Sequence, residues 1–305
     1  METVEILLAT YNGEQFLRMQ LDSIFAQSYK TFRLIIRDDG STDATLAIIK
    51  EYQNLYPDKI YLFRDESKQV GAIQNFSLLL QNSEADYIFL CDQDDIWHEN
   101  KMELSLQKIK SMEAEHPQQP ILVHHDMEVI DENNEQLHPS KWTLENNNPK
   151  HNKLQYLLGS NHVQGCTVLI NKALRQQLLP IPKEAVMHDH WLALLAVSIG
   201  KIGYLPEALG KYRIHAHNVT GQTRNGKKRS FTSNKNINKL YSSLFLQASA
   251  FLQQYRQLLS DSATNLIQNF LNLQTAGFLK RKYLIIANSL YRPTWPKTLF
   301  FILRF

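Results

Sequence analysis

The sequence predicts an α/β protein with a mostly parallel central sheet, flanked by helices and followed by a helical C-terminal extension. Three observations lead to this prediction. Short apolar runs alternate with helical patterns over the first hundred residues, which is typical of a parallel sheet with right-handed crossovers. Acidic residues follow directly after two of these runs, at 38–39 and at 92–95. Apolar residues recur at helical spacing in the last third of the chain.

The elements follow from these patterns in chain order. In the first part we expect strands at 4–9, 32–37, 60–63 and 87–91, and helices at 14–28, around 46–52, at 71–82 and at 100–113. Further along we expect a strand beginning at 121–123, a polar loop at 145–152, a strand at 164–170, a helix at 192–199, a strand edge near 212–216 and helical periodicity over 240–273.

Composition excludes several classes of protein. The chain has 305 residues and a formal charge of +3, too small an excess to indicate a nucleic-acid partner. Its two cysteines have no zinc-site or disulfide-framework spacing, which favours a reducing compartment. We find no signal-peptide pattern at the N-terminus and no apolar run long enough to span a bilayer. We therefore expect a cytoplasmic protein, either free or peripheral on the inner face of the cell membrane.

The main acidic motif is Asp92-Gln93-Asp94-Asp95, at the end of the expected strand 87–91. Clustered carboxylates repel one another, and a cation between them relieves the repulsion. Aspartate oxygens suit Mg²⁺ or Mn²⁺, and Mg²⁺ usually completes its shell with substrate phosphates. The motif predicts a metal-bridged diphosphate. The alternative is an acidic turn that caps the following helix.

A second acidic strand end, Asp38-Asp39, would open on the same edge of the sheet. A carboxylate there can accept the imide N–H of a uracil or thymine ring. The alternative is a helix cap, and we expect both: residues 41–43 cap the helix, with Ser41 or Thr42 as the cap, while Asp38 and Asp39 face a ligand.

Two further motifs lie late in the chain. Asp189, flanked by two histidines and a tryptophan, stands at the mouth of an apolar helix, where it is either a general base or a helix cap. His215 and His217 share one face of the expected strand edge, and one of them could supply a nitrogen ligand to a metal.

Taken together, these motifs resemble family 2 glycosyltransferases, and most closely the bacterial rhamnosyltransferases of cell-wall and surface-polysaccharide synthesis. The resemblance rests on the following stretches, in unbroken order between Val4 and Gly221: 10–13, 38–43, 71–76, 92–95 with Trp97, and 188–189. It implies a GT-A fold in residues 1–220, with a nucleotide-sugar half at about 1–98 and an acceptor half at about 99–220.

The resemblance also implies the role of each site residue. Nucleotide binding is expected from Thr10, Tyr11, Asn12, Asp39, Asn75, Asp92 and Gln93, with Asp39 on the base. Asp92, Asp94 and His215 would bind the metal, with His217 as a bystander, and Asp189 would deprotonate the acceptor. The acceptor side would comprise Gln164, Gly165, His188, Trp191 and Trp97, with His188 standing where many relatives have glutamate.

The implied reaction is metal-dependent transfer of a sugar, L-rhamnose from dTDP-rhamnose, with a dTDP- or UDP-sugar as the wider donor class and Mg²⁺ or Mn²⁺ as cofactor. The acceptor would be a glycan or a polyprenyl-linked glycan. One base without an enzyme nucleophile implies inversion at the anomeric carbon. The alternatives are a phosphatase or phosphotransferase of the Asp-x-Asp type and a non-catalytic module that binds nucleotide sugars or glycans.

The C-terminal region, 221–305, mixes basic residues with bulky apolar ones. Such a mixture is typical of a segment that lies on a membrane surface. A helical appendage packed on the main domain, with its charges in solvent, fits the pattern equally well.

Overall fold

The computed structural model describes residues 2–215 and 234–290. Its strands are β1 (Val4–Thr10), β2 (Arg33–Asp38), β3 (Ile60–Leu62), β4 (Tyr87–Cys91), β5 (Ile96–Trp97), β6 (Ile121–Ile130), β7 (Gln136–His138), β8 (Leu169–Asn171) and β9 (Lys201–Arg213). They form one sheet in the order β3-β2-β1-β4-β8-β6-β9-β5, and β7 pairs with β6.

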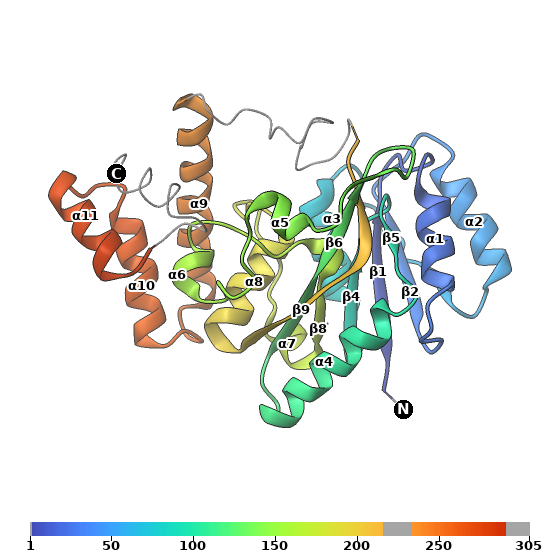
Figure 1. Ribbon diagram of the computed structural model, residues 1–305, viewed down its shortest axis with the longest axis horizontal. Helices are drawn as coiled ribbons and strands as arrows, with labels where there is room; N and C mark the ends of the chain where they lie inside the picture. The colour runs from blue at the N-terminus through green and yellow to red at the C-terminus, as the bar shows by residue number, and fades with distance from the viewer. Residues whose placement is uncertain (1, 216–233, 291–305) are drawn as a thin grey trace.

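Helices cover both faces of this sheet (Figure 1). They are α1 (Leu17–Phe25), α2 (Thr45–Leu55), α3 (Gly71–Asn82), α4 (Lys101–Glu115), α5 (Lys141–Glu145), α6 (Leu154–Leu157), α7 (Lys172–Gln177), α8 (His188–Ile199), α9 (Asn234–Tyr255), α10 (Asp261–Asn272) and α11 (Phe278–Ala287). A short 3₁₀ turn, η1, spans Gly165–Thr167.

The first part of the sheet is parallel, as the alternation of strands and helices predicts. β1 pairs in parallel with β2 and β4, and β2 pairs in parallel with β3. The carboxyl ends of β1, β2 and β4 therefore meet at one edge, where ligands of α/β proteins bind. The second part is mixed: β8 runs antiparallel to both β4 and β6, while β9 runs parallel to β6.

Alternating side chains of the buried strands supply two hydrophobic cores, one on each face of the sheet. In β4, Ile88 and Leu90 belong to the core under α3 and α8, whereas Phe89 belongs to the core under α1 and α4. This two-sided burial explains why the strand is apolar throughout.

The C-terminal helices α9 and α10 pack against the main domain and share its core. Phe251 of α9 lies edge-on to Trp191 of α8, with 5.3 Å between the ring centroids. On α11, by contrast, Phe278, Leu279 and Tyr283 are exposed. In the part of the chain that the structure describes, no helix is both long enough and apolar enough to cross a membrane. His217, the basic stretch 224–229 and the tail 291–305 lie outside the described residues.

The helical periodicity predicted over 240–273 is confirmed, and it belongs to two helices, α9 and α10, the second of which begins where the Ser260 hydroxyl accepts from the Ala263 N–H at 3.1 Å. Two local predictions were wrong. The expected strand at 164–170 is the η1 turn followed by the short β8. Neither Ser41 nor Thr42 caps α2, whose N-cap residue is Ala44 and has no side-chain cap. The proposed division into two halves near residue 98 stays a prediction.

Candidate active site

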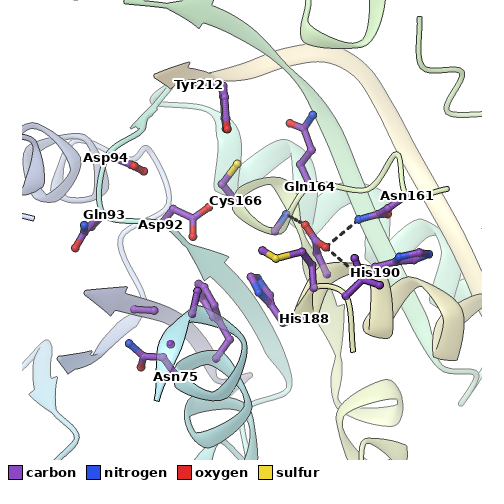
Figure 2. Close-up of a pocket in the computed structure, with 18 of the residues that line it drawn as sticks. Asn75, Asp92, Gln93, Asp94, Asn161, Gln164, Cys166, His188, His190 and Tyr212 are labelled. Atoms are coloured by element: carbon purple, nitrogen blue, oxygen red, sulfur yellow. Dashed lines mark hydrogen bonds between the residues drawn. The ribbon is translucent and has the colours of Figure 1, made fainter. Parts of the chain in front are cut away.

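A cavity of about 1020 Å³ opens where β1 and β4 end. It gathers residues that lie far apart in the sequence, as Figure 2 shows for Asp92 and Asp94 on one side and Asn161, Gln164 and His188 on the other. The predicted site residues in its wall are Thr10, Tyr11, Asn12, Asp39, Asn75, Asp92, Gln93, Asp94, Gln164, Gly165, His188, Asp189 and His215.

The loop after β1 is fixed from two sides. The backbone N–H of Tyr11 donates to Oε1 of Gln93 at 2.8 Å, and Nε2 of Gln93 donates to the Tyr11 carbonyl at 3.0 Å. Asn12 has a left-handed backbone with φ of 47°, and its Oδ1 accepts from the Thr42 N–H at 2.9 Å. Asparagine tolerates this conformation better than most residues. The amide group of Gln93 is therefore occupied in shaping the loop that we predict to bind the nucleotide.

Asp39 forms part of the cavity wall and is only 3% exposed. Its carboxylate accepts from the Arg37 guanidinium at 3.1 Å and from the backbone N–H groups of Val70 and Gly71 at 3.0 and 2.8 Å. Asp38 was expected to face the ligand too, and this is wrong: its carboxylate accepts from the Thr10 hydroxyl at 2.9 Å and does not line the cavity. At the end of β2, Asp39 thus faces the cavity, while Asp38 hydrogen-bonds to Thr10 and holds β1 to β2.

Asn75, on α3, also lines the cavity and is 2% exposed. Its Nδ2 donates at 3.4 Å to the carbonyls of Thr10 and Arg37, while its Oδ1 has no hydrogen-bond partner among the described residues. The side chain ties α3 to the ends of β1 and β2.

The acidic motif splits into two neighbouring groups. Nε2 of His215 lies 2.7 Å from Oδ2 of Asp94, which joins two of the predicted metal ligands. Oxygens of Asp92 and Asp95 and the sulfur of Cys166 lie within 4.8 Å of one another. Arg213 fixes the motif from behind, because its Nε donates to the Asp94 carbonyl at 2.9 Å.

Burial, together with neighbouring negative charge, raises the pKa of two carboxyl groups at this edge, Asp92 and Asp95. Burial, and then the charges of Asp94 and Asp95, raise the pKa of Asp92 well above its usual range. Burial, and then Asp94, raise the pKa of Asp95 to about 7. Within the described part of the chain, Oδ2 of Asp95 is buried without a hydrogen-bond partner. Several carboxylates with one imidazole suit Mg²⁺ or Mn²⁺, so the residues present fit a divalent cation.

Asp189 lies across the cavity, in the first turn of α8, and is 8% exposed. Its carboxylate accepts from Nδ2 of Asn161 and from the Gly165 N–H, both at 2.8 Å, and from the His190 N–H at 2.5 Å. Burial raises the pKa of Asp189 to about 6, although these hydrogen bonds oppose the shift. The N-cap residue of α8 is Met187, so the simple helix-cap alternative for Asp189 is not what the structure shows. A carboxylate with this pKa is ionised at neutral pH and can take a proton.

His188 precedes Asp189 in the chain and also lines the cavity. Its ring stacks on Phe76 with 4.0 Å between centroids, and burial lowers its pKa to about 3. A Cβ on Gly165 would lie 2.5 Å from Nε2 of His188. The close approach of this neutral imidazole therefore requires glycine at position 165.

Two predicted acceptor-binding residues lie elsewhere, and the prediction is corrected for both. Trp97 is 3% exposed and packs against Phe89, with 5.8 Å between ring centroids. Trp191 is fully buried between α8 and α9. Neither lines the cavity.

Other residues of the site were not found from the sequence. Asn161, Cys166 and Tyr212 line the cavity, and Asn161 binds the carboxylate of Asp189 directly. Nothing in the sequence around Asn161 distinguishes it from a loop residue. For Tyr212, the only indication in the sequence that it belongs to the site is its position three residues before His215. The polar loop expected at 145–152 contributes Glu145 and Asn147 to the wall.

Comparison with known proteins places this geometry in a family. Residues 5–178 match the model of glycosyl transferase family 2. An uncharacterised protein of Mycobacterium tuberculosis is 31% identical over 222 residues, covering 71% of this chain; the chain spans 60% of that protein's length. A dTDP-rhamnosyl transferase of Shigella flexneri, RfbG, is 42% identical over 98 residues, which are 31% of this chain and 34% of RfbG.

A solved structure shows the same fold. TarS residues 1–349 of S. aureus, in complex with UDP-GlcNAc, superposes with a TM-score of 0.57 at 16% identity, over 94% of this chain and 80% of that one. The present structure has a GT-A-like glycosyltransferase fold, with a central sheet flanked by helices, and a C-terminal helical part. The family model covers more than half of the sequence, and the chain belongs to glycosyl transferase family 2.

Proposed function

We propose that this protein is an inverting, metal-dependent glycosyltransferase that moves L-rhamnose from dTDP-rhamnose to a glycan or polyprenyl-linked glycan in bacterial polysaccharide synthesis. The observation that carries the proposal is the meeting of Asp92, Asp94 and Asp189 in a single cavity. The likeness to a dTDP-rhamnosyl transferase over 98 residues supports the choice of donor.

The donor would bind at the β1 and β4 side of the cavity. The loop held by Gln93 and the wall formed by Asp39 would take the nucleotide. Asp94 and His215, with Asp92 nearby, would hold Mg²⁺ or Mn²⁺. Such an ion, when bound, neutralises the charge that develops on a departing diphosphate.

The acceptor would bind at the α8 side. Asp189 accepts the proton of the attacking hydroxyl group, while Asn161 and the Gly165 N–H hold its carboxylate in place. We assign no carboxylate of the cavity to attack on carbon, because Asp92 and Asp94 are assigned to metal and Asp39 is occupied by three hydrogen bonds. Glu145, which also lines the cavity, is paired with Lys141 at 2.6 Å. A single base with direct attack inverts the anomeric centre.

The family match leaves the phosphatase or phosphotransferase alternative without support, since the acidic motif lies within the matched residues. The test of the proposal is a screen of dTDP-, UDP- and GDP-sugars with Mn²⁺, Mg²⁺ or EDTA, read by release of the nucleoside diphosphate and by transfer to a glycan or polyprenyl-linked glycan. We expect turnover with dTDP-rhamnose, its loss in EDTA, and an NMR spectrum of the product that shows inversion. Binding of nucleotide sugars without turnover would favour the non-catalytic module.

A further inference from the structure

A buried lysine lies beneath the cavity, and the proposed chemistry does not use it. Lys101 is the first residue of α4 and has no exposed surface. Its Nζ donates to the main-chain carbonyl of Cys166 at 2.6 Å and lies 3.6 Å from the centre of the Trp97 ring. Burying an ammonium group is costly unless its hydrogen bonds and charge are satisfied. The position of Lys101 therefore calls for an explanation.

The contacts of Lys101 indicate that it holds a segment in place. Burial lowers the pKa of Lys101 to about 8, while nearby acidic groups, among them Asp95 and Asp92, raise it. Across residues 2–215 and 234–290, however, no carboxylate lies within 4.0 Å of Nζ as an ion-pair partner. The close contacts of the ammonium are a carbonyl oxygen and an aromatic face, both of which favour a fixed position.

The carbonyl that Lys101 binds belongs to a turn between the two sides of the active site. Cys166 is the middle residue of η1, and its sulfur lies within 4.8 Å of carboxylate oxygens of Asp92 and Asp95. The neighbouring Gly165 N–H donates to Oδ2 of Asp189 at 2.8 Å. The turn thus touches the acidic strand end on one side and the base on the other.

We propose that Lys101 is a positioning residue for sugar transfer: by holding the Cys166 carbonyl it fixes the η1 turn, and through Gly165 it sets where the Asp189 carboxylate stands relative to Asp92. The Trp97 ring contacts the ammonium group and orients it toward the turn. The role of Trp97 is therefore to position Lys101, and not to bind the acceptor. This inference rests on the proposed glycosyltransferase function.

The test is Lys101→Met in the full-length protein, with the donor that the wild-type enzyme uses. Methionine fills much of the same space and removes both the charge and the hydrogen bond. We expect kcat to fall about 10- to 100-fold, because a small displacement of a catalytic group has effects of that order. The KM for the donor should stay within about threefold, because the displaced group, Asp189, acts on the acceptor hydroxyl group while the donor binds on the β1 and β4 side of the cavity.

Two further variants separate positioning from packing. Lys101→Arg keeps a cation with N–H donors above the Trp97 ring and should recover part of kcat. Lys110→Met, on the same helix, removes an exposed ion pair with Glu2 and should leave kcat unchanged. If Lys101 only packs, Lys101→Met would lower the melting temperature and leave kcat of the folded protein at the wild-type value, which would overturn the inference.

A variant on the opposite side of the turn covers the case in which Lys101→Met does not fold. Gly165→Ala places a methyl group against His188 and displaces the same turn. It should show the same split, with reduced kcat and an unchanged KM for the donor; an unchanged kcat would refute the role of the turn. Absence of transfer by the wild-type protein would instead contradict the proposed function itself.

Discussion

Replacing Asn161 by alanine should move the pH dependence of the reaction by a predictable amount. The Asn161 amide donates to Oδ1 of Asp189 at 2.8 Å, and this bond stabilises the ionised carboxylate. A hydrogen bond to a charged group contributes roughly 1.5–3 kcal/mol. In the variant, water in the cavity can replace part of the lost Asn161 hydrogen bond. We therefore use the lower end of this energy range. Since 1.36 kcal/mol corresponds to one pKa unit, the pKa of Asp189 should rise by about one unit.

The sign of the effect follows from the role of the group. A base works when ionised, so kcat/KM falls as the pH drops through its pKa. With the pKa of Asp189 at about 6 in the wild-type protein, the acidic limb should lie near pH 6 and move to about pH 7 in Asn161→Ala. The plateau at high pH should change much less, because Gly165 and His190 still bind the carboxylate.

The assay is the initial rate of nucleoside diphosphate release between pH 5 and pH 9 at saturating metal, for the wild-type protein and the variant side by side. Asn148→Ala is the matched control, because Asn148 is exposed and lies outside the cavity wall. An acidic limb that stays in place, or moves to lower pH, would refute the assignment of Asp189 as the base whose ionisation limits the reaction.

Three further predictions follow from individual contacts. Asp189→Asn should lower kcat by about 10²- to 10⁴-fold while the Kd for the nucleoside diphosphate, measured by calorimetry, stays the same; wild-type turnover would remove the base assignment. His215→Ala leaves Asp94 without its partner at 2.7 Å and should raise the Mn²⁺ concentration for half-maximal activity at least about tenfold; an unchanged metal requirement would exclude His215 as a ligand. Burial lowers the pKa of His124 to about 3 and that of His162 to about 4, so the unfolded state binds more protons below pH 6.5 and stability is lost as the pH falls from there. At pH 5 each histidine should cost roughly 2 kcal/mol, while the active-site carboxyl groups whose pKa values are raised act in the opposite direction. Urea unfolding of the wild-type protein and of His124→Phe at pH 7 and pH 5 isolates the contribution of one histidine; the same change in stability between the two pH values in both proteins would contradict the prediction.

Much of the nucleotide side could be predicted because it depends on local patterns. A run such as 87–91 is recognisable as a buried strand, and parallel pairing then brings the residues after it to the same edge as those after β1 and β2. The bounds of α3 and β4 were predicted to the residue. Strand ends and helix starts are therefore sufficient to place Asp39, Asp92 and Asp94 in one cavity.

The acceptor side depends on contacts between distant segments, and there the sequence was less informative. Residues 164–170 are apolar enough for a strand, yet the carbonyl of Gln164 accepts from the N–H and hydroxyl of Thr167, and the chain turns. Trp191 follows Asp189 by two positions, which is about 200° around a helix. One side chain therefore faces the cavity and the other faces α9, although both belong to the same motif.

The place of β9 in the sheet has a consequence for anyone who prepares shortened versions or chimeras of this protein. The family match ends at residue 178, before β9, but β9 lies between β6 and β5 and hydrogen-bonds to both. A fragment cut at the end of the match would strip an interior strand from the sheet and leave two unpaired edges, which invite aggregation. Exchange of segments between relatives should therefore keep β5, β6 and β9 from the same parent.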